Sequence, residues 1–500
     1  MILCTRMSTT PTAINKPAVF TPWTKGELPA APIFRFRQLT LLIGPGLVMA
    51  GANIGGGEWL FGPVVTARYG GTILWIAFTA IMLQVAYNLA IMRYTLYCGE
   101  NIFVGFFRTK PGPRFWTIFY MTLDLAGAWP YLASNAAVPL AAVILGHLPA
   151  AEDANFVKTL GYALFLVAFI PLIFGGKIYN MLERILVAKL FLVLGYLGFI
   201  ALFWVSWHTW REIWSGLVRF GALPQGEVNW ALIAGFAAVA GSGGLFNTTI
   251  SGYVRDKGWG MGAQVGAIPS AVGGRTIKLS HSGKVFDESS PENRSRWLGW
   301  LRHIRRDQLM LWAPGCILGM VLPAMMSYEF IRGTTASDHA AAAMAADAIA
   351  SKHGQAFWYL TLLCGFLIML PTQVSQLDGI ARRWTDVIWI GNARVQHLEG
   401  NQAKNVYYAL LAAYGVWGLL ALKITPSPLV LAIATGVMVN FAFAFSALHA
   451  LWVNMTLLPK PLRPGWILRI GLVAGAVFYA GISIIGLRQQ WPKIAQWLFG

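Results

Sequence analysis

The sequence predicts an all-α polytopic membrane protein, and three observations support this prediction. Of the 500 residues 56% are hydrophobic and only 12% are charged, and the mean hydropathy is +0.57. A soluble globular domain carries about 25% charged residues. Apolar runs long enough to cross a bilayer as a helix recur along the whole chain. Two of these runs are interrupted by glycine clusters, which predicts helices that are broken inside the membrane.

We expect eleven membrane-spanning helices. The apolar runs that define them are residues 40–66, 71–93, 115–146, 158–176, 182–206, 229–251, 308–328, 355–380, 405–423, 427–453 and 467–487. Spans one to five and spans six to ten each begin with an interrupted helix. Because five is an odd number, the second group has the opposite orientation in the membrane. The pattern therefore predicts a 5+5 inverted repeat with broken helices 1 and 6, followed by an eleventh helix.

The spans divide the chain into a tail, two repeats and a final helix. The tail lacks the apolar core of a signal peptide, so we expect it to be disordered and cytosolic. The expected parts are the tail (1–36), the first repeat (37–206), the second repeat (207–453) and the eleventh helix with the C-terminus (454–500). The second repeat contains a basic cytosolic loop at 255–306 and an outer loop helix at 329–354.

The net charge of +18 does not indicate a nucleic-acid partner, because most of the 38 lysines and arginines lie in short loops. A cytosolic N-terminus places most of them on the cytosolic side, as the positive-inside rule requires. We therefore expect an integral protein of a bacterial-type inner or plasma membrane, with its C-terminus outside. The end of the basic loop, with Arg302, Arg305 and Arg306, is expected to attract anionic lipid headgroups; a partner or regulatory site is the alternative.

The first glycine cluster lies within residues 43–61, where Gly55, Gly56 and Gly57 precede Glu58. Unpaired backbone groups are costly in hydrocarbon, so such a break persists only beside protein or a polar cavity. Glu58 would lie at the amino end of the second half-helix, where the helix dipole favours a negative charge. With Asn53 and the freed carbonyl groups, this break is a candidate binding site.

The second cluster is Gly241-Ser242-Gly243-Gly244, followed by Asn247 and Thr248. Interrupted helices at matching places in two halves indicate the central site of a transporter. The expected substrate-binding residues are Asn53, Gly55, Gly56, Gly57, Glu58, Ser242, Gly243, Asn247 and Thr248. Their ligands are oxygen only, which suits a hard cation such as Mg²⁺. An organic solute held by the half-helix amides is equally compatible.

Two further residues are candidates for a proton pathway. Asp124 is ten residues into span three, about 15 Å along the helix and near the bilayer midplane. No basic residue shares its span, so we expect an unpaired carboxylate that could take and release a proton. His449 in span ten could titrate if it faces water. The alternative for both is a structural hydrogen bond between helices, which we also expect for Gln376 and the other polar residues of the spans.

Several of these features resemble the Nramp family of divalent-metal transporters, within the amino acid-polyamine-cation superfamily fold. Gly44-Pro45-Gly46 followed nine residues later by a glycine-rich break is similar to the family's first helix, and Leu123-Asp124-Leu125-Ala126 is similar to its Thr-Asp-Leu-Ala run. The resemblance implies that Asp124 lies on a proton route. The departures are informative: Gly55 to Glu58 replaces the family's Asp-Pro-Gly-Asn, and Gly-Ser-Gly-Gly replaces its Ala-x-Met-Pro-His. The sequence therefore resembles a divergent, Nramp-like branch.

The predicted function is secondary active transport of a hard divalent cation of the Mg²⁺ or Mn²⁺ type, with Glu58 as the metal ligand and a proton as the coupling ion. One alternative is a proton- or sodium-coupled carrier of a small organic solute, and another is a non-transporting membrane receptor or scaffold. An enzyme is not expected, because the sequence has no P-loop and no HExxH pair. No cofactor and no metal cluster are expected, since the four cysteines are scattered. The oligomeric state is left open.

Overall fold

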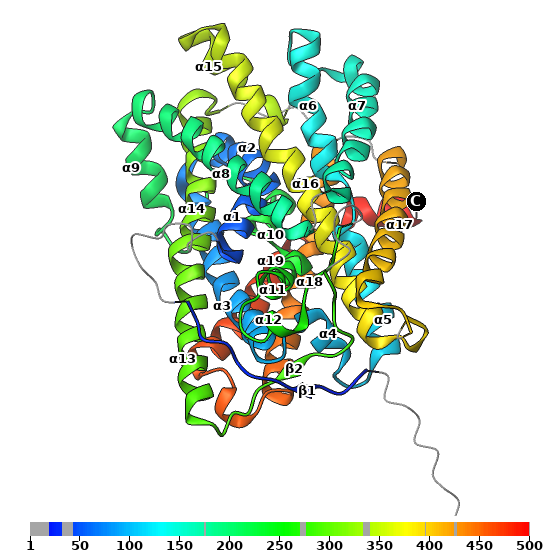
Figure 1. Cartoon of the computed structure of the whole chain (residues 1–500). Helices are drawn as coiled ribbons and strands as arrows, with labels where there is room; N and C mark the ends of the chain where they lie inside the picture. Colours follow the sequence, from blue (N-terminus) through cyan, green and yellow to red (C-terminus); the bar gives the residue numbers. More distant parts are fainter. Residues whose placement is uncertain are drawn as a thin grey trace, which may run out of the picture.

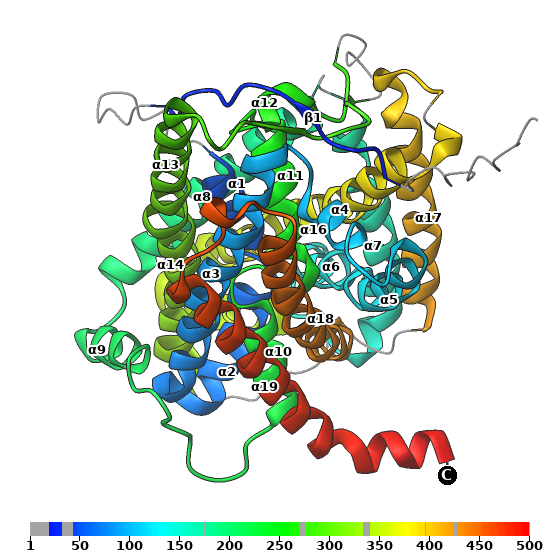
Figure 2. The ribbon, with the colours of Figure 1, turned by 90° about the horizontal axis from the view of Figure 1, so that it is seen from below.

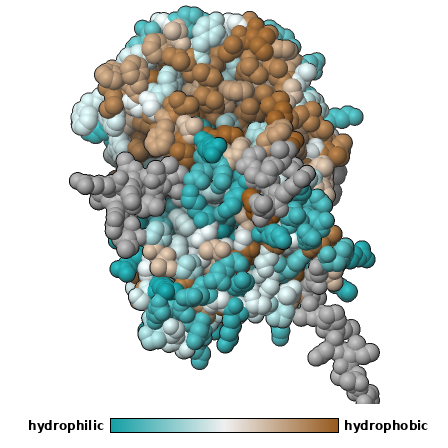
Figure 3. Space-filling model, in the orientation of Figure 1, coloured by the Kyte–Doolittle hydropathy of each residue, from teal (hydrophilic) through white to brown (hydrophobic). Residues whose placement is uncertain are grey.

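The computed structural model describes residues 20–32, 44–174, 177–270, 277–333, 341–395, 397–424 and 428–499. Over these residues it is a bundle of helices with one short two-stranded sheet (Figure 1). Nine helices of the described part are long and apolar enough to cross a membrane. Apolar residues cover the upper part of the face shown in Figure 3, and polar residues cover the lower part. The chain is thus an all-helical integral membrane protein, and the count of eleven spans stays a prediction.

The first half contains two interrupted spans. Its helices are α1 (Pro45–Asn53), a π-helical turn (Gly57–Phe61), α2 (Gly62–Tyr69), α3 (Leu74–Cys98), α4 (Ile102–Phe107), α5 (Pro113–Gly127), α6 (Tyr131–Leu145), α7 (Ala154–Val167) and α8 (Ile178–Phe203). We expected 115–146 to be one helix, but α5 ends at Gly127 and α6 begins at Tyr131. Pro130 explains the interruption, because a proline has no N–H and disfavours helix in the residue before it.

The second half and the final helix follow the expected order of elements. They are α9 (Trp207–Gly216), α10 (Trp230–Val239), α11 (Thr249–Asp256), α12 (Gly262–Val265), α13 (Pro291–Arg306), a π-helical turn (Asp307–Trp312), α14 (Ala313–Phe330), α15 (Ala346–His353), α16 (Gln355–Gly391), α17 (Ala403–Ile424), α18 (Pro428–Thr456) and α19 (Trp466–Phe499). Short 3₁₀ turns are Gly70–Ile73, Ala151–Asp153, Ile170–Ile173, Gly244–Thr248, Ala341–Ala343, Ala393–Val395, Gly400–Gln402 and Lys460–Leu462.

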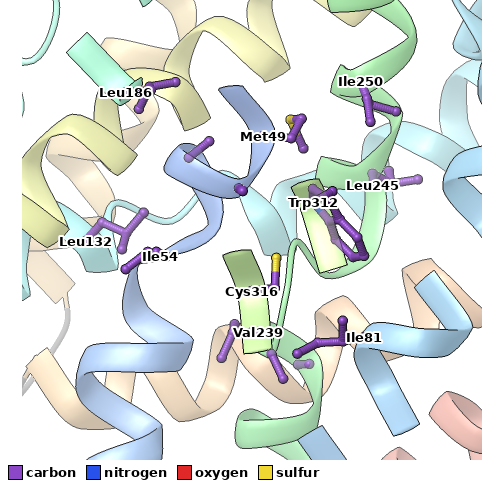
Figure 4. Packing of buried hydrophobic residues seen from close by; sticks show 14 of the residues in the cluster. Met49, Ile54, Ile81, Leu132, Leu186, Val239, Leu245, Ile250, Trp312 and Cys316 are labelled. Atoms are coloured by element: carbon purple, nitrogen blue, oxygen red, sulfur yellow. The ribbon is translucent and has the colours of Figure 1, made fainter. Parts of the chain in front are cut away.

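Both expected helix breaks are present. Helix α1 stops at Asn53, and Ile54 has the non-helical angles φ −64° and ψ 89°. Helix α10 stops at Val239, and Gly241 and Gly243 follow with φ of +87° and +73°, values that glycine adopts without strain. The breaks touch, since a Cβ at Gly57 would overlap the carbonyl group of Val239. Figure 4 shows Ile54, Val239 and other apolar side chains packed around this crossing.

The tail is partly ordered, contrary to our expectation of disorder over 1–36. Within 20–32, strand β1 (Thr24–Lys25) pairs in parallel with β2 (Lys284–Val285), Leu28 is fully buried, and the Trp300 indole donates to the Pro29 carbonyl over 2.8 Å. The aromatic side chains of this stretch help to explain the packing, because Trp23 contacts Tyr94 and Tyr97 of α3 and Phe20 lies beside Gly391 at the end of α16. Residues 1–19 and 33–36 lie outside the described residues.

The basic loop at 255–306 is a folded cap rather than an extended connection. It contains α12, β2 and α13, and α13 continues through the π-helical turn into α14. Seen from below in Figure 2, β1 crosses beside α12 at this end of the bundle. The outer loop contains α15, near the opposite end in Figure 1. The cap therefore covers the end of the bundle that the charge pattern assigns to the cytosol.

Candidate functional site

A cavity of about 60 Å³ lies where the two breaks meet. This volume has room for a few water molecules. Its walls come from α1, α5, α6, the break after α10, α16 and α18. The polar residues that line it are Asn53, Asp124, Tyr131, Ser242, Thr372, Gln376, Arg383 and Thr435. We call this space the central cavity.

The structure brings about half of the predicted binding residues to the central cavity. Asn53, Gly56, Gly57, Ser242 and Gly243 line it. The other four, which are Gly55, Glu58, Asn247 and Thr248, are not among its lining residues. Helix α16 supplies three polar lining residues: Gln376, which we expected to be a contact between helices, and Thr372 and Arg383, which we did not predict.

Glu58 joins the two breaks to each other. Its carboxylate is fully buried, and its two oxygens accept hydrogen bonds from the Gly55 amide (3.0 Å) and the Gly241 amide (3.2 Å). Backbone amides freed by a helix break need such a partner, because an unsatisfied N–H is costly away from water. The position predicted to bind a substrate or metal directly thus forms an internal link between spans one and six.

Gln84 of α3 forms hydrogen bonds with the backbone groups that the second break leaves without helical partners. No pattern in the sequence indicates this role. Its Oε1 accepts from the amides of Ser242 (2.8 Å) and Gly243 (3.2 Å) and from Asn247 Nδ2 (3.1 Å), while its Nε2 donates to the Ala240 carbonyl over 2.6 Å. These amides are therefore already bonded. Our expectation that bare half-helix amides could hold a substrate carboxylate is not met at this break.

Asn247 and Thr248 have structural contacts of the same kind. Asn247 also donates from Nδ2 to Asn88 Oδ1 over 2.9 Å, and the Thr248 hydroxyl donates to the Leu245 carbonyl over 2.6 Å. Both side chains are fully buried. They fix the half-helix that follows the second break.

Lys189 of α8 is a buried cation that we did not predict. Its side chain is 2% exposed, and its Nζ donates a short hydrogen bond to the Thr372 hydroxyl. That hydroxyl has the Ile368 carbonyl at 2.8 Å and the Ile54 carbonyl at 3.3 Å as alternative acceptors. None of the ion pairs in the described part of the chain includes Lys189. The signal in the sequence was a lysine inside an apolar span, which is a functional candidate by default.

Asp124 is paired, contrary to our expectation. Its carboxylate accepts from Arg383 Nε over 2.9 Å, forms a short ion pair with Arg383 Nη2, and accepts from the Trp384 indole over 2.7 Å. Our boundary for span eight at residue 380 left Arg383 outside the membrane, but α16 continues to Gly391. The central region therefore has two acids, Glu58 and Asp124, and two bases, Lys189 and Arg383.

His449 does not face water. It is 2% exposed, and its ring nitrogens are bonded to the Thr109 hydroxyl (2.8 Å) and the Tyr120 hydroxyl (2.7 Å). Phe106 stacks on the ring with 4.6 Å between centroids. The residue is absent from the lining of the central cavity. Its contacts are those of the structural alternative that we weighed for it.

Three polar atoms of the cavity residues are buried and have no hydrogen-bond partner among the described residues: Asn53 Oδ1, Ser242 Oγ and Gln376 Oε1. Buried polar groups without partners are rare in native structures. They belong to span one, the second break and α16. A ligand in the central cavity could satisfy all three at once.

The donor set does not resemble a dense metal site. Within the part of the chain that the structure describes, no group of three or more His, Cys, Asp or Glu could hold a metal ion. The cavity offers amide, hydroxyl and carbonyl oxygens, with one carboxylate that is paired to arginine. Oxygen atoms suit hard cations, but dedicated sites for such ions usually include free carboxylates.

Neither a scan against protein-family models nor a search of curated proteins found a match. Among solved structures, the chain is similar to the Eremococcus coleocola manganese transporter in complex with an aromatic bis-isothiourea substituted compound, with a TM-score of 0.58, 15% identity, and coverage of 92% of this chain and 89% of that one. A mutant of the same transporter matches with a TM-score of 0.59, 14% identity, and coverage of 96% and 91%. At these identities the similarity shows the fold alone. The chain therefore has the fold of an Nramp manganese transporter, as its sequence predicted.

Proposed function

We propose that this protein is a secondary transporter that carries a small, uncharged or zwitterionic organic solute through the central cavity. The observation that carries the proposal is that three buried oxygens without a partner among the described residues, on Asn53, Ser242 and Gln376, belong to residues that line one cavity where two broken helices meet. Helix breaks that surround a polar cavity are typical of transporter binding sites. The shared fold supports the same conclusion.

The charge balance favours an organic solute over a divalent cation. Glu58 is bonded to backbone amides, and Asp124 is paired with Arg383. A divalent cation would add two positive charges beside Lys189 and Arg383, and like charges repel strongly where water is scarce. An uncharged or zwitterionic solute avoids this repulsion.

The solute should be small and should donate hydrogen bonds. Two of the three free oxygens belong to side-chain amides and can only accept, and the third is a hydroxyl. Hydroxyl, amide or ammonium groups on the solute would match them. Apolar lining residues such as Leu132 and Phe246 would contact its carbon atoms.

A hard divalent cation remains the second candidate, because the fold is shared with a manganese transporter and the cavity offers oxygen ligands. In that case Asn53, Gln376 and Asp124 would supply the first ligands. Glu58, which we first expected to be the metal ligand, would then act by linking the two helix breaks through its hydrogen bonds to Gly55 and Gly241.

For coupling, we propose that Asp124 takes and releases the proton. Protonation of its carboxylate would free Arg383 from the ion pair, and both side chains line the cavity. Sodium is the alternative coupling ion. We also propose that α1 with α2, and α5 with α6, each cross the membrane once, which gives eleven spans in a 5+5 inverted repeat with the N-terminus in the cytosol.

Thermal-shift assays and calorimetric titrations of the purified protein can test the proposal. The ligands to be tested are small polyols, amines and amino acids, together with Mg²⁺, Mn²⁺ and Cd²⁺. We expect saturable binding of an organic solute and its uptake into proteoliposomes. Saturable binding of a divalent cation, with no solute bound, would replace the first candidate by the second. Binding without accumulation would indicate a receptor or scaffold.

A further inference from the structure

A second and larger cavity, of about 590 Å³, lies away from the central site on the side of the bundle. It is bounded by α3, by the junction of α13 and α14, and by the start of α19. Figure 2 shows these three segments next to one another at the end of the bundle that carries the cap. We call this cavity the lateral groove.

The walls of the lateral groove are apolar and face outward. Met82 on α3, Leu309 at the helix junction, and Trp466 and Ile467 on α19 are 39%, 44%, 71% and 70% exposed. All four belong to helices that are long and apolar enough to cross the membrane. In a bilayer such walls meet lipid rather than water.

Of the described residues that line the groove, only Arg93 and Arg305 are charged. Arg93 donates from Nη1 to the Leu462 carbonyl over 2.7 Å and lies 5.6 Å from the Trp297 ring, but its Nε has no partner among the described residues. Both guanidinium groups belong to residues that line the same groove. Neither forms an ion pair with a carboxylate in the described part of the chain. Two guanidinium groups without an ion-pair partner, beside apolar walls, form a site that suits an anion with an apolar tail.

The position of the arginines matches the level of lipid headgroups. Arg93 is five residues from the end of α3, near the point where the Leu96 carbonyl accepts from the Met261 amide of the cap (3.1 Å). Arg305 is at the end of α13, within the cap. Trp466 begins α19 beside them, and tryptophan is enriched at membrane interfaces.

We propose that the lateral groove binds an anionic phospholipid, with its phosphate between Arg93 and Arg305 and its acyl chains along the apolar walls. The planar guanidinium group matches the geometry of a phosphate and can donate two hydrogen bonds to it. Basic pockets between membrane helices on the cytosolic side hold lipid headgroups for the same reason. A bound lipid would join α19 to α3 and α13. The proposal does not depend on what the central cavity carries.

Native mass spectrometry of the full-length protein in detergent tests this site, with equal amounts of phosphatidylglycerol and phosphatidylcholine added. The groove variant is the double substitution Arg93→Gln with Arg305→Gln. The matched control is Arg294→Gln with Arg394→Gln, which removes the same charge from exposed positions outside the groove. We expect the wild type to retain phosphatidylglycerol preferentially, the control to keep this preference, and the groove variant to lose about fivefold in affinity per arginine.

The single variant Arg305→Gln keeps the test valid if the double variant does not fold. The Arg305 side chain is exposed, so its replacement should not disturb the fold. It should lose about fivefold by itself. Equal losses in the groove and control variants would indicate a diffuse surface effect and overturn the proposal. Absence of any preference for phosphatidylglycerol in the wild type would also overturn it. So would competition by free glycerol 3-phosphate at the concentration of the lipid, since the apolar walls would then contribute nothing.

Discussion

Two buried polar regions of this molecule are built in different ways. Around the central cavity, one ion pair, Asp124 with Arg383, lies beside three residues that each carry an oxygen atom without a partner among the described residues. Nearer the cap is a denser group, the tail-side charge layer, formed by Arg255, Asp256, Asp378, Arg382 and Asp386. In that layer every charged group has at least one ion-pair partner.

The tail-side charge layer fastens α11 to α16. Arg382 bonds Asp378 (2.9 Å) on its own helix and forms a short ion pair with Asp256, while Arg255 bonds Asp386 over 2.5 Å. All five side chains are at most 1% exposed. Buried atoms without a hydrogen-bond partner among the described residues occur here too, at Arg255 Nη2 and Asp386 Oδ2, so the two regions differ in the number of their ion pairs rather than in complete hydrogen bonding. The comparison distinguishes a group of ion pairs that joins two helices from the cavity for which we propose binding.

The largest effect is expected from Arg382→Gln, which leaves Asp256 and Asp378 without their shared partner. Removing one member of a buried ion pair costs about 3–5 kcal/mol. The melting temperature in detergent should therefore fall steeply. Arg219→Gln is the matched control. Arg219 pairs with Glu212 over 3.1 Å, but its side chain is 46% exposed, and such a pair should contribute about 0–1 kcal/mol to the free energy of unfolding. Equal effects of the two substitutions would mean that the tail-side charge layer does not fasten the helices.

The next effect concerns the crossing of the two breaks. In Gly57→Ala the new methyl group meets the backbone carbonyl of Val239, which cannot rotate away as a side chain can. Overpacking costs about 1–3 kcal/mol, and we expect this loss in the free energy of unfolding together with loss of transport. Gly198→Ala on α8 is the control, since no atom of the described residues lies within 4 Å of the position that its methyl group would take. A stable, active Gly57→Ala protein would contradict the close crossing.

The sequence predicted the class of fold and the two breaks because these depend on local composition. Glycine clusters within apolar runs mark breaks wherever the rest of the chain lies. The partners of Glu58 and Asp124 were not predictable in this way. Gly241 is 183 residues from Glu58, and Arg383 is 259 residues from Asp124. Only the folded bundle brings such pairs together.

Two expected boundaries differ from those of the described elements. Helix α16 continues past residue 380, the expected end of span eight, and residues 20–32 of the expected tail pack against the bundle. Charge within a helix is tolerated when it is paired, as for Arg382 with Asp378. A tail without apolar runs can still bury single residues, as for Leu28. In both cases contacts with residues distant in the sequence determine where the ordered element begins or ends.

A third prediction addresses the pair in the central cavity. Asp124→Asn leaves the Arg383 guanidinium buried without its partner, so this substitution alone mixes stability with proton coupling. The double-mutant cycle with Arg383→Gln separates them, and we expect a coupling energy of about 0.5–3 kcal/mol in the free energy of unfolding. In proteoliposomes, the double variant should bind solute but lose proton-driven uptake. Unchanged proton dependence there would exclude Asp124 as the proton carrier.

The smallest and most specific effect is expected from Ser242→Ala. The Ser242 hydroxyl has no hydrogen-bond partner among the described residues, so its removal breaks no bond, and stability should change by no more than about 0.5 kcal/mol. If the solute bonds this hydroxyl, affinity should fall by about 0.5–1.5 kcal/mol, or roughly 2- to 13-fold. Ser327→Ala is the opposite control, because its hydroxyl donates to the Pro63 carbonyl over 2.6 Å and is absent from the cavity lining. That substitution should lower stability and leave affinity unchanged. Calorimetric titration and thermal melting of both variants measure the two quantities, and an unaltered affinity in Ser242→Ala would remove this hydroxyl from the binding site.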